Sequence, residues 1–528
     1  MEIGEYKECC LRKYYEFFRV SWIMIREGVI ASLPSEQLPA IVVLGKKITS
    51  LFVSRNIKKC QRSDRLARAM ERLGPSYVKM GQFLATRPDL IGKKVSEDLA
   101  LLQDKMDFFS TTKAKSLVSI ALKSPIETLY CEFRDPVAAA SIAQVHPAII
   151  HDINGRRKVA VKVIRPGIRK RFFRDIQVMY FIARIQEKLF PSMRRLCLSA
   201  VVRTLEQVTK MEMDLRLEAA AFSEMSDNIA KDQGFRVPKI YWNRTERDVV
   251  TMEWIDGIKI SDTGKLRANG YDLERLSVVL VQSFLLHTLR DGFFHADLHP
   301  GNLFVDSNEC IVAVDMGITG RLSKRERRFL AEILYGFISR DYQRVADVHF
   351  EAGYVPRHHN PSSFAQAIRA IGEPIHGQSS DTISMGKLLT MLFEITELFD
   401  MMTRPELVML QKTMVVVEGV ARMLNPDFNM WTSSEPIVEE WIRDNIGPKR
   451  YMNDFQDGLK TAFRLVQSVP QFSAPVENIY KLLLESSEKN IFLNSSKKEF
   501  PHYRYYLLEK LILWITLGAL LYIIATIL

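Results

Sequence analysis

The segment HADLHPGN (residues 295–302), followed after a short interval by DMG (residues 315–317), decides the fold of this chain. Two apolar runs of β type, Leu303–Val305 and Ile311–Val314, lie between these motifs and are separated by a polar turn. Short apolar runs on either side of a polar turn predict a β-hairpin. One carboxylate and one carboxamide therefore precede the hairpin, and a second carboxylate follows it.

The spacing of these polar groups indicates phosphoryl transfer. Asp297 and Asn302 are separated as in the catalytic loop of kinases, and Asp315 begins a tripeptide in the place of Asp-Phe-Gly. In that chemistry one Asp orients the attacking hydroxyl, while an Asn and a second Asp hold the Mg²⁺ that bridges the phosphates. We therefore expect Asp297 to be catalytic, and Asn302 and Asp315 to bind Mg²⁺.

Two other interpretations of this segment fit less well. Both Asp residues could simply cap a polar turn, but the loop, hairpin and acidic tripeptide arrive in kinase order. His295 and His299 could be metal ligands, but no further His or Cys cluster in the sequence completes their coordination shell.

Composition narrows the class of protein. The chain has 528 residues, of which 47% are hydrophobic and 26% charged, which is typical of a globular protein of several domains. Its net charge of +11 favours an anionic partner such as phosphates or an acidic membrane surface. Basic runs occur at residues 46–68 and 156–175, but no aromatic-basic module accompanies them, so we do not expect nucleic-acid binding. The six cysteines lack CxxC spacing and indicate reduced thiols.

A helix with one apolar and one polar face is predicted to begin at Pro75, which suits a first helical position. Pro88 marks its far end. Lys79 and Gln82 lie on its polar face. Gly81 in its interior costs about 1 kcal/mol relative to Ala. We therefore expect another backbone to pass close to Gly81.

Strands are predicted from about residue 126. Thr128–Phe133 reads as a strand, Val137–Val145 as a strand-turn-strand, and Val159–Ile164 as a buried strand that contains Lys162. A Lys in a buried strand is costly without an anionic partner. In kinases the Lys of such a strand meets the nucleotide phosphates and a helical Glu. A Lys that points outward from an edge strand is the alternative.

The turn in the second of these segments stands where kinases have a glycine-rich loop, but it is rich in Ala. Ala adopts positive φ poorly, so the composition predicts a stiffer loop and altered nucleotide handling. The expected nucleotide-binding residues of this loop are Val137, Ala138, Ala139, Ala140, Ser141, Ile142, Ala143, Gln144 and Val145.

Two helices, over residues 171–190 and 199–232, are predicted next. One acid of the second helix should pair with Lys162, but periodicity does not select among the candidates, which are Glu206, Glu212, Asp214, Glu218 and Glu224.

Val237–Tyr241 and Asp248–Ile255 read as strands, and a helix over residues 272–291 leads into the catalytic loop. The segment around Glu253 is similar to a hinge between two lobes, whose backbone would meet the adenine edge. The exit of a β-hairpin explains this segment equally well.

The last eighteen residues, Leu511–Leu528, carry no charge. A helix of this length spans about 27 Å, enough for the hydrocarbon core of a bilayer. Lys and Arg residues precede it and nothing charged follows, so the body is expected on the cytoplasmic side. A buried C-terminal core helix is the alternative.

Several motifs together resemble the UbiB family of atypical, kinase-like proteins. Besides HADLHPGN, DMG and the segment at residues 407–424, they are Lys79-x-Gly81-Gln82, AAASIAQV at 138–145, VAVKV at 159–163 and MEMDLRLEA at 211–219. The resemblance implies an α+β, mostly helical, protein-kinase-like fold of two lobes, with an N-terminal helical extension and a C-terminal transmembrane helix. The implied parts are an N-terminal helical region (1–60), a helical extension (61–125), an N-lobe (126–257), a C-lobe (258–500) and a transmembrane helix (511–528).

The resemblance also implies residue roles. Lys79 and Gln82 of the Lys-x-Gly-Gln motif would pack over the nucleotide site together with Glu212 and block a protein substrate. Lys162 would pair with Glu218. The expected ligands are ATP or ADP with Mg²⁺.

The implied activity is that of an ATP-dependent kinase or ATPase that supports aerobic ubiquinone biosynthesis, including regulation of ring hydroxylation. It would act at the bacterial inner membrane, near membrane lipid or quinone intermediates and other ubiquinone biosynthesis proteins. One alternative is a non-catalytic, nucleotide-dependent scaffold that presents or extracts prenylated quinone precursors. A small-molecule kinase is a further alternative, against which the Lys79 motif and the terminal apolar segment argue.

Overall fold

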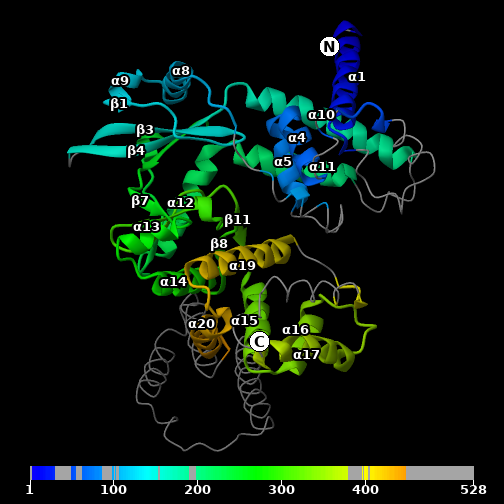
Figure 1. Cartoon of the computed structure of the whole chain (residues 1–528), viewed down its shortest axis with the longest axis vertical. Helices are drawn as coiled ribbons and strands as arrows, with labels where there is room; N and C mark the ends of the chain where they lie inside the picture. The colour runs from blue at the N-terminus through cyan, green and yellow to red at the C-terminus, as the bar shows by residue number, and fades with distance from the viewer. Residues whose placement is uncertain are drawn as a thin grey trace, which may run out of the picture. The chain divides into compact units, whose positions relative to one another are not determined.

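The structure is a computed structural model, drawn in Figure 1, and the residues that it describes are 3–29, 49–54, 57, 62–85, 95, 98, 99, 102, 106–152, 155–189, 198–377, 395, 398–401 and 405–446. By their contacts the residues form two units, 1–443 and 444–528. The first unit contains nearly all of the described residues. The boundaries that the family resemblance implied for the N-terminal region, the helical extension, the two lobes and the transmembrane helix remain predictions.

Three N-terminal helices form a group in which the second packs on the first and third, and the first and third pack on a later helix, α10 (Ile168–Leu189). They are α1 (Ile3–Arg26), α4 (Arg62–Leu73) and α5 (Pro75–Ala85). Gly74 permits the turn between α4 and α5 because it adopts φ +105°, a conformation that L residues rarely reach. The Arg171 guanidinium of α10 donates to the Leu73 carbonyl at 3.0 Å and so joins this turn to α10. The predicted helix start at Pro75 is confirmed.

Gly81 packs against two leucine side chains. A Cβ atom on Gly81 would lie 2.4 Å from Cδ1 of Leu102 and 3.4 Å from Cδ2 of Leu99. Both leucines are buried. Among the described residues, the atoms nearest to a Cβ at position 81 therefore belong to packed side chains, and the close approach of another backbone stays a prediction.

An antiparallel sheet of five strands follows, in the order β1-β3-β4-β6 with β2 paired to β3. Its strands are β1 (Glu132–Phe133), β2 (Ala138–Ala139), β3 (Ala143–Asp152), β4 (Gly155–Ile164) and β6 (Val249–Glu253). Lys162 of β4 lies opposite Val145 of β3 and Val250 of β6. Because β4 is paired on both sides, the alternative of a lysine on an edge strand is wrong.

The two faces of this sheet have different neighbours. Val118 of α8 (Thr111–Leu122) packs in one buried cluster with three valines of β4. Side chains alternate along a strand, so Lys162 emerges on the opposite face. On that side lies α12 (Leu215–Asn228), which contacts β6.

Two of the predicted strands are shorter than expected, and a proline lies beside or within each of them. The segment Thr128–Phe133 begins in a short helix, α9 (Ile126–Leu129), which Pro125 precedes, and only its last two residues form a strand. Val237–Tyr241 contributes only an isolated bridge from Ile240. Proline at position 238 lacks the N–H that a ladder requires, which explains the interruption.

The predicted helix over residues 199–232 is two helices, α11 (Leu198–Glu212) and α12. Asp214 is the N-cap of α12, and its carboxylate accepts the backbone N–H of Arg216. Side-chain capping satisfies one of the free N–H groups at the new helix start. Hydrophobic periodicity misses the break because each helix keeps an apolar face.

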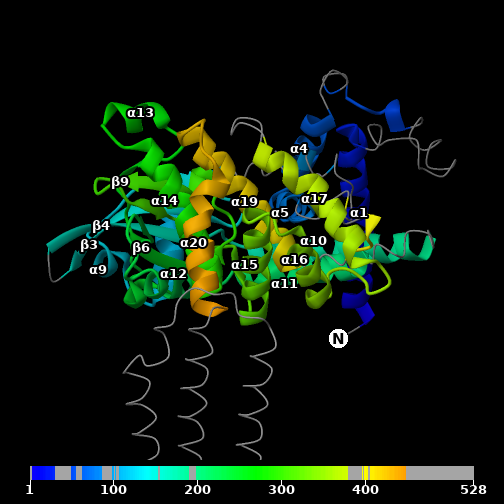
Figure 2. The same cartoon turned by 90° about the horizontal axis from the view of Figure 1, so that it is seen from below.

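The rest of the first unit is mainly helical and carries two small sheets. Its helices are α13 (Thr263–Ala268), α14 (Leu273–Leu286) with a π-helical turn at His287–Asp291, α15 (Lys324–Ile338), α16 (Tyr342–Ala352), α17 (Pro361–Gly377), α19 (Pro405–Leu424) and α20 (Met430–Asn445). The sheets are β5-β10-β9-β7 and β11-β8. Their strands are β5 (Phe235–Arg236), β7 (Gly257–Lys259), β8 (Phe293–His295), β9 (Leu303–Asp306), β10 (Ile311–Ala313) and β11 (Thr319–Arg321). The antiparallel pairing of β9 with β10 confirms the predicted hairpin, and α19 packs on α14 (Figure 2).

None of the described helices is both long and apolar enough to cross a membrane. The predicted transmembrane helix, Leu511–Leu528, lies outside the described residues.

Candidate active site

The catalytic loop lies between β8 and β9 and is held by its own backbone. The N–H of Ala296 donates to the Ile318 carbonyl at 3.0 Å, and the N–H of Asp297 donates to Nδ1 of His295 at 3.0 Å. His295 is buried, and burial lowers its pKa, so the imidazole is neutral and Nδ1 accepts. The Asn302 carboxamide donates to the Asp297 carbonyl at 3.2 Å and approaches Oδ2 of Asp297 at 3.4 Å. The loop therefore places the Asp297 and Asn302 side chains side by side.

Asp315 is brought to the same place by the hairpin. The N–H of Val314 donates to the Asn302 carbonyl at 2.9 Å, which joins the end of the hairpin to the end of the loop. The N–H of Gly317 donates to Oδ1 of Asp315 at 2.8 Å. The other carboxylate oxygen lies 3.6 Å from Nζ of Lys162. One carboxamide and one carboxylate are the oxygen donors that suit Mg²⁺, which is bound through few protein oxygens together with substrate phosphates.

Lys162 pairs with Glu218 of α12 at 2.7 Å, and the two side chains are only 13% and 7% exposed. The contact decides among the five candidate acids. Each of three others has a different structural partner: Glu224 pairs with Arg321 at 2.5 Å, Asp214 caps α12, and Glu206 pairs with Lys210 at 2.7 Å.

Lys162, Glu218 and Asp315 form one electrostatic unit. Burial acts to lower the pKa of Lys162, but Asp315 and Glu218 outweigh it and raise the pKa above its usual value. Burial acts to raise the pKa of Asp315, but Lys162 and the Gly317 N–H lower it to about 2. Burial also raises the pKa of Glu218, against the opposing attraction of Lys162. Lys162 therefore stays charged at neutral pH and can meet an anionic ligand.

The Lys-x-Gly-Gln helix is fastened by a second ion pair. Nζ of Lys79 on α5 lies 2.8 Å from Glu212 at the end of α11, and their side chains are 15% and 7% exposed. Lys79 is also one of the charges that lower the pKa of Asp315. Gln82 lies on the same helix and is half-buried.

The alanine loop is a tight β2–β3 hairpin in which the Ala140 N–H donates to the Ala143 carbonyl at 2.8 Å. Arg165, just after β4, donates to the carbonyls of Ala140 at 2.9 Å and Asp107 at 2.8 Å. Arg165 therefore ties the end of β4 to the alanine loop, which is the kind of contact that keeps a loop stiff.

Two predicted nucleotide-binding residues use their side chains elsewhere. The buried Gln144 carboxamide exchanges hydrogen bonds with both backbone groups of Phe109, at 3.0 and 3.1 Å. The Glu253 carboxylate pairs with Arg236 at 3.0 Å, and its backbone N–H donates to the Lys239 carbonyl at 2.8 Å. Because both side chains are engaged, these two residues could contact a nucleotide only through their backbone.

Sequence reasoning missed one residue that touches the catalytic loop. Thr413 of α19 is buried, and its single hydroxyl proton is shared between the Ala296 carbonyl at 3.0 Å and the Met409 carbonyl of its own helix at 2.9 Å. The two residues are 117 positions apart. No sequence motif links them, so only the packing of α19 on the site could reveal the contact.

Comparisons with known proteins match most of the chain. Residues 101–349 match the family described as ABC1 atypical kinase-like domain, and residues 368–429 match the UbiB helical domain. The "Probable protein kinase UbiB" of Marinobacter nauticus is 37% identical over 469 residues, which cover 87% of this chain and 84% of that protein. The protein of the same description from Vibrio cholerae serotype O1 (strain M66-2) is 38% identical over 460 residues, which cover 86% and 84%.

A solved structure from Mycobacterium tuberculosis, described as the complex of Rv3197 with erythromycin, is 22% identical with a TM-score of 0.48. It covers 74% of this chain and 97% of that chain. The family matches confirm the predicted kinase-like fold of mixed helix and sheet. The chain belongs to the UbiB family of atypical kinase-like proteins.

Proposed function

We propose that this protein binds ATP with Mg²⁺ and acts as an atypical kinase or ATPase that supports aerobic ubiquinone biosynthesis. The observation that carries the proposal is the position of Lys162, which lies 2.7 Å from Glu218 and 3.6 Å from Asp315. A buried cation between two carboxylates, beside a loop carrying Asp297 and Asn302, matches the parts that phosphoryl transfer uses.

Each residue has one proposed role. Lys162 meets the nucleotide phosphates, and Glu218 holds it in place. Asn302 and Asp315 hold Mg²⁺, which neutralises the charge of the phosphates. Asp297 orients the attacking hydroxyl or water and accepts its proton. The loop Val137–Val145 covers the nucleotide through its backbone.

The test is Mg-ATP binding and hydrolysis by the purified full chain carrying Asp315→Asn. We expect loss of Mg²⁺-dependent binding and at least a hundredfold fall in hydrolysis, because a metal ligand and a partner of Lys162 are removed together. Asp427→Asn is the matched control, since Asp427 is exposed and lies in none of the described site contacts. An Asp315→Asn protein that binds and hydrolyses Mg-ATP like wild type would disprove the proposal.

A second function, a non-catalytic nucleotide-dependent scaffold, is favoured by one observation. The Lys79–Glu212 pair fastens α5, and Lys79 also acts electrostatically on Asp315. In this proposal α5 stands in the way of a protein substrate. A deletion strain complemented with Asp297→Asn distinguishes the two functions. If that strain makes normal amounts of ubiquinone, nucleotide binding without transfer is sufficient and the scaffold is correct. If prenylated precursors accumulate, chemistry at Asp297 is required.

The location and partners are part of the same proposal. Leu511–Leu528 anchors the protein in the bacterial inner membrane with the body on the cytoplasmic side, close to lipid and quinone intermediates. There it regulates the ring-hydroxylation steps together with other ubiquinone biosynthesis proteins. The support is the family membership and the uncharged terminal segment.

A further inference from the structure

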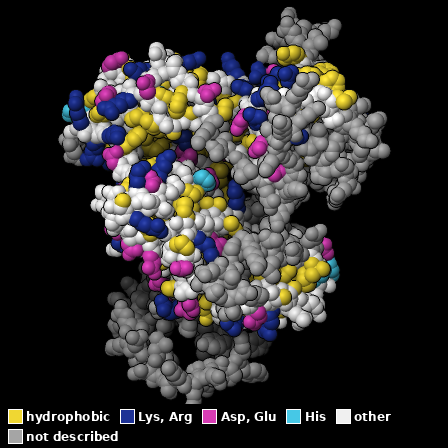
Figure 3. All heavy atoms as spheres, viewed as in Figure 1, with side chains coloured by type: hydrophobic (Ala, Val, Ile, Leu, Met, Phe, Trp, Pro, Cys, Tyr) yellow, Lys and Arg dark blue, Asp and Glu magenta, His cyan; other side chains and the backbone are white. Residues whose placement is uncertain are grey.

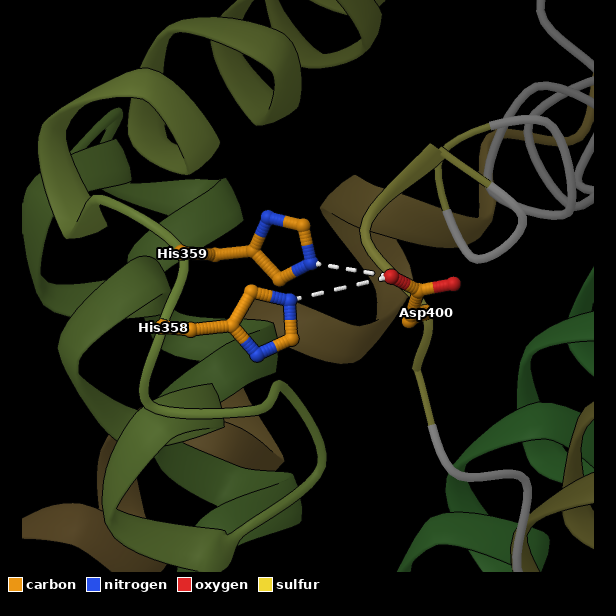
Figure 4. Close-up of side chains that lie close together, drawn as sticks. All are labelled: His358, His359 and Asp400. Atoms are coloured by element: carbon orange, nitrogen blue, oxygen red, sulfur yellow. Dashed lines mark hydrogen bonds and ion pairs between the residues drawn. The ribbon is translucent and has the colours of Figure 1, made fainter.

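Two histidines and an aspartate that are separate from the proposed nucleotide residues lie together at one point of the helical part (Figure 4). His358 and His359 are in the loop between α16 and α17, and Asp400 precedes α19. Nε2 of His359 lies 3.3 Å and Nε2 of His358 lies 3.8 Å from the same oxygen, Oδ2 of Asp400. Within the described part of the chain, this is the one group of three such side chains whose ligand atoms lie within 4.8 Å of one another.

The spacing of these atoms fits a coordination polyhedron. Zinc binds imidazole nitrogen and carboxylate oxygen at about 2.0–2.2 Å with tetrahedral angles. Two ligands of a tetrahedral ion are therefore about 3.3–3.5 Å apart. The observed 3.3 Å between His359 and Asp400 equals that edge, and the 3.8 Å from His358 exceeds it by a fraction of an ångström.

Hydrogen bonding alone explains only half of the arrangement. His359 is within hydrogen-bond distance of Asp400 and packs on Phe399, with ring centroids 5.3 Å apart. His358 is beyond that distance, and its side chain is 67% exposed, so burial does not hold it there. Its ring nevertheless lies over that of His359 with centroids 4.1 Å apart. The two rings thus bring two imidazole nitrogens to the same carboxylate oxygen.

The donor set indicates the class of cation. Imidazole suits zinc and other first-row transition ions, whereas Mg²⁺ and Ca²⁺ prefer oxygen ligands alone. Three protein ligands leave a position for water.

We propose that His358, His359 and Asp400 form a binding site for a divalent transition-metal cation, of which zinc is the expected one. The ion would join the loop that follows α16 to the turn that precedes α19. Because Asp400 is forty-one positions from His359, the sequence shows no motif for this site. The inference does not depend on the proposed nucleotide chemistry, and its test does not measure that chemistry.

The experiment is a zinc titration of the purified, metal-stripped full chain, followed by calorimetry and by competition with a chromophoric chelator. The variants are His358→Ala and Asp400→Asn, whose wild-type side chains are 67% and 71% exposed, so the fold should tolerate both changes. Asn also tolerates the positive φ of 47° that Asp400 adopts. His151→Ala is the matched control, since His151 is exposed and outside the cluster.

We expect wild type and His151→Ala to bind one zinc ion with a micromolar Kd, and each cluster variant to bind it at least tenfold more weakly. Zinc should also raise the thermal unfolding midpoint of wild type and the control, but not of the cluster variants, because a ligand that binds only the folded state stabilises it. Absence of submillimolar zinc binding by wild type would overturn the proposal. Equal binding by wild type and both cluster variants would overturn it as well, because the ion would then be bound elsewhere.

Discussion

At the scale of single residues, the site is organised by buried charges that compensate one another. Lys162 is shared by Glu218 and Asp315, and Lys79 is paired with Glu212. A charge in a protein interior is costly unless it is paired, so removing one partner affects more than the contact itself.

The Lys79–Glu212 pair can be tested by a double-mutant cycle. Lys79→Met leaves the Glu212 carboxylate buried without this cation and should destabilise the protein by roughly 3–5 kcal/mol. Glu212→Gln should cost a similar amount, and the double variant should cost less than the two single changes added together. The measurement is the free energy of unfolding of all four proteins.

The matched control for this cycle is Lys210→Met, since Lys210 and Glu206 form a pair in which Lys210 is 60% exposed. That change should cost roughly 1 kcal/mol or less. Additive losses for Lys79→Met and Glu212→Gln would show that the pair contributes no coupling energy.

Buried histidines should make the protein sensitive to acid. Burial lowers the pKa of His349 to about 4, and Nδ1 of His349 is hydrogen-bonded to the Val345 carbonyl at 2.7 Å. The unfolded chain takes up this proton near pH 6.5, whereas the folded protein does so only near pH 4. Stability is therefore full above pH 6.5 and falls as the pH drops toward 4, by on the order of 2–3 kcal/mol for this residue.

The variant His349→Asn keeps a donor toward Val345 but cannot take up a proton. Its free energy of unfolding should fall less than that of wild type between pH 7 and pH 4.5. The exposed His151→Asn should follow wild type. Parallel pH profiles for wild type and His349→Asn would mean that this histidine does not contribute to the acid sensitivity.

At the scale of elements, helices distant in the sequence position the site. α12 presents Glu218 to Lys162 and is itself tied to β11, just after Asp-Met-Gly, by the Glu224–Arg321 pair. α19, in the part that matches the UbiB helical domain, contacts the catalytic loop through Thr413. The helical domain is thus connected directly to the backbone beside Asp297.

The contact from α19 predicts a positioning role for Thr413. Thr413→Val keeps the shape but leaves the Ala296 carbonyl without this donor, which should cost about 1–3 kcal/mol of stability. If the bond also orients the loop, kcat for Mg-ATP hydrolysis should fall several-fold while KM stays nearly constant.

Thr413→Ser retains the hydroxyl and should restore kcat, although it removes a buried methyl group. If Thr413→Val and Thr413→Ser lose stability equally and keep wild-type kcat, the contact matters only for packing.

At the scale of the whole molecule, the chain carries a net charge of +11. Figure 3 shows Lys and Arg side chains distributed over the visible face with Asp and Glu among them. A general positive excess favours an anionic membrane surface, with attraction that salt weakens.

Deletion of residues 511–528 should distinguish membrane attachment by the apolar segment from membrane attraction by the net positive charge. We expect the shortened protein to leave the membrane pellet at high salt, because only electrostatic attraction remains, while wild type stays in the pellet. Mg-ATP hydrolysis per molecule should be unchanged in the same preparation. A shortened protein that resists salt extraction would show that Leu511–Leu528 is not the anchor.

The sequence by itself determined the parts of the site that are local in the chain. The order of loop, hairpin and Asp-Met-Gly could be read from residues 295–317, because turns and short strands depend on neighbouring residues. The hairpin around the alanine loop and the strand that carries Lys162 could be read in the same way.

Only the tertiary structure decided which distant groups meet. Periodicity gives the face of a helix but not its partner and left five acids open, so the pairing of Lys162 with Glu218, which the family resemblance implied, needed the structure to confirm it. The structure also showed that Asp214 is a cap. It also brought Thr413 to the catalytic loop and Asp400 to two histidines. Such contacts join residues 41 to 117 positions apart, and they form only when buried apolar faces have fixed how the helices pack.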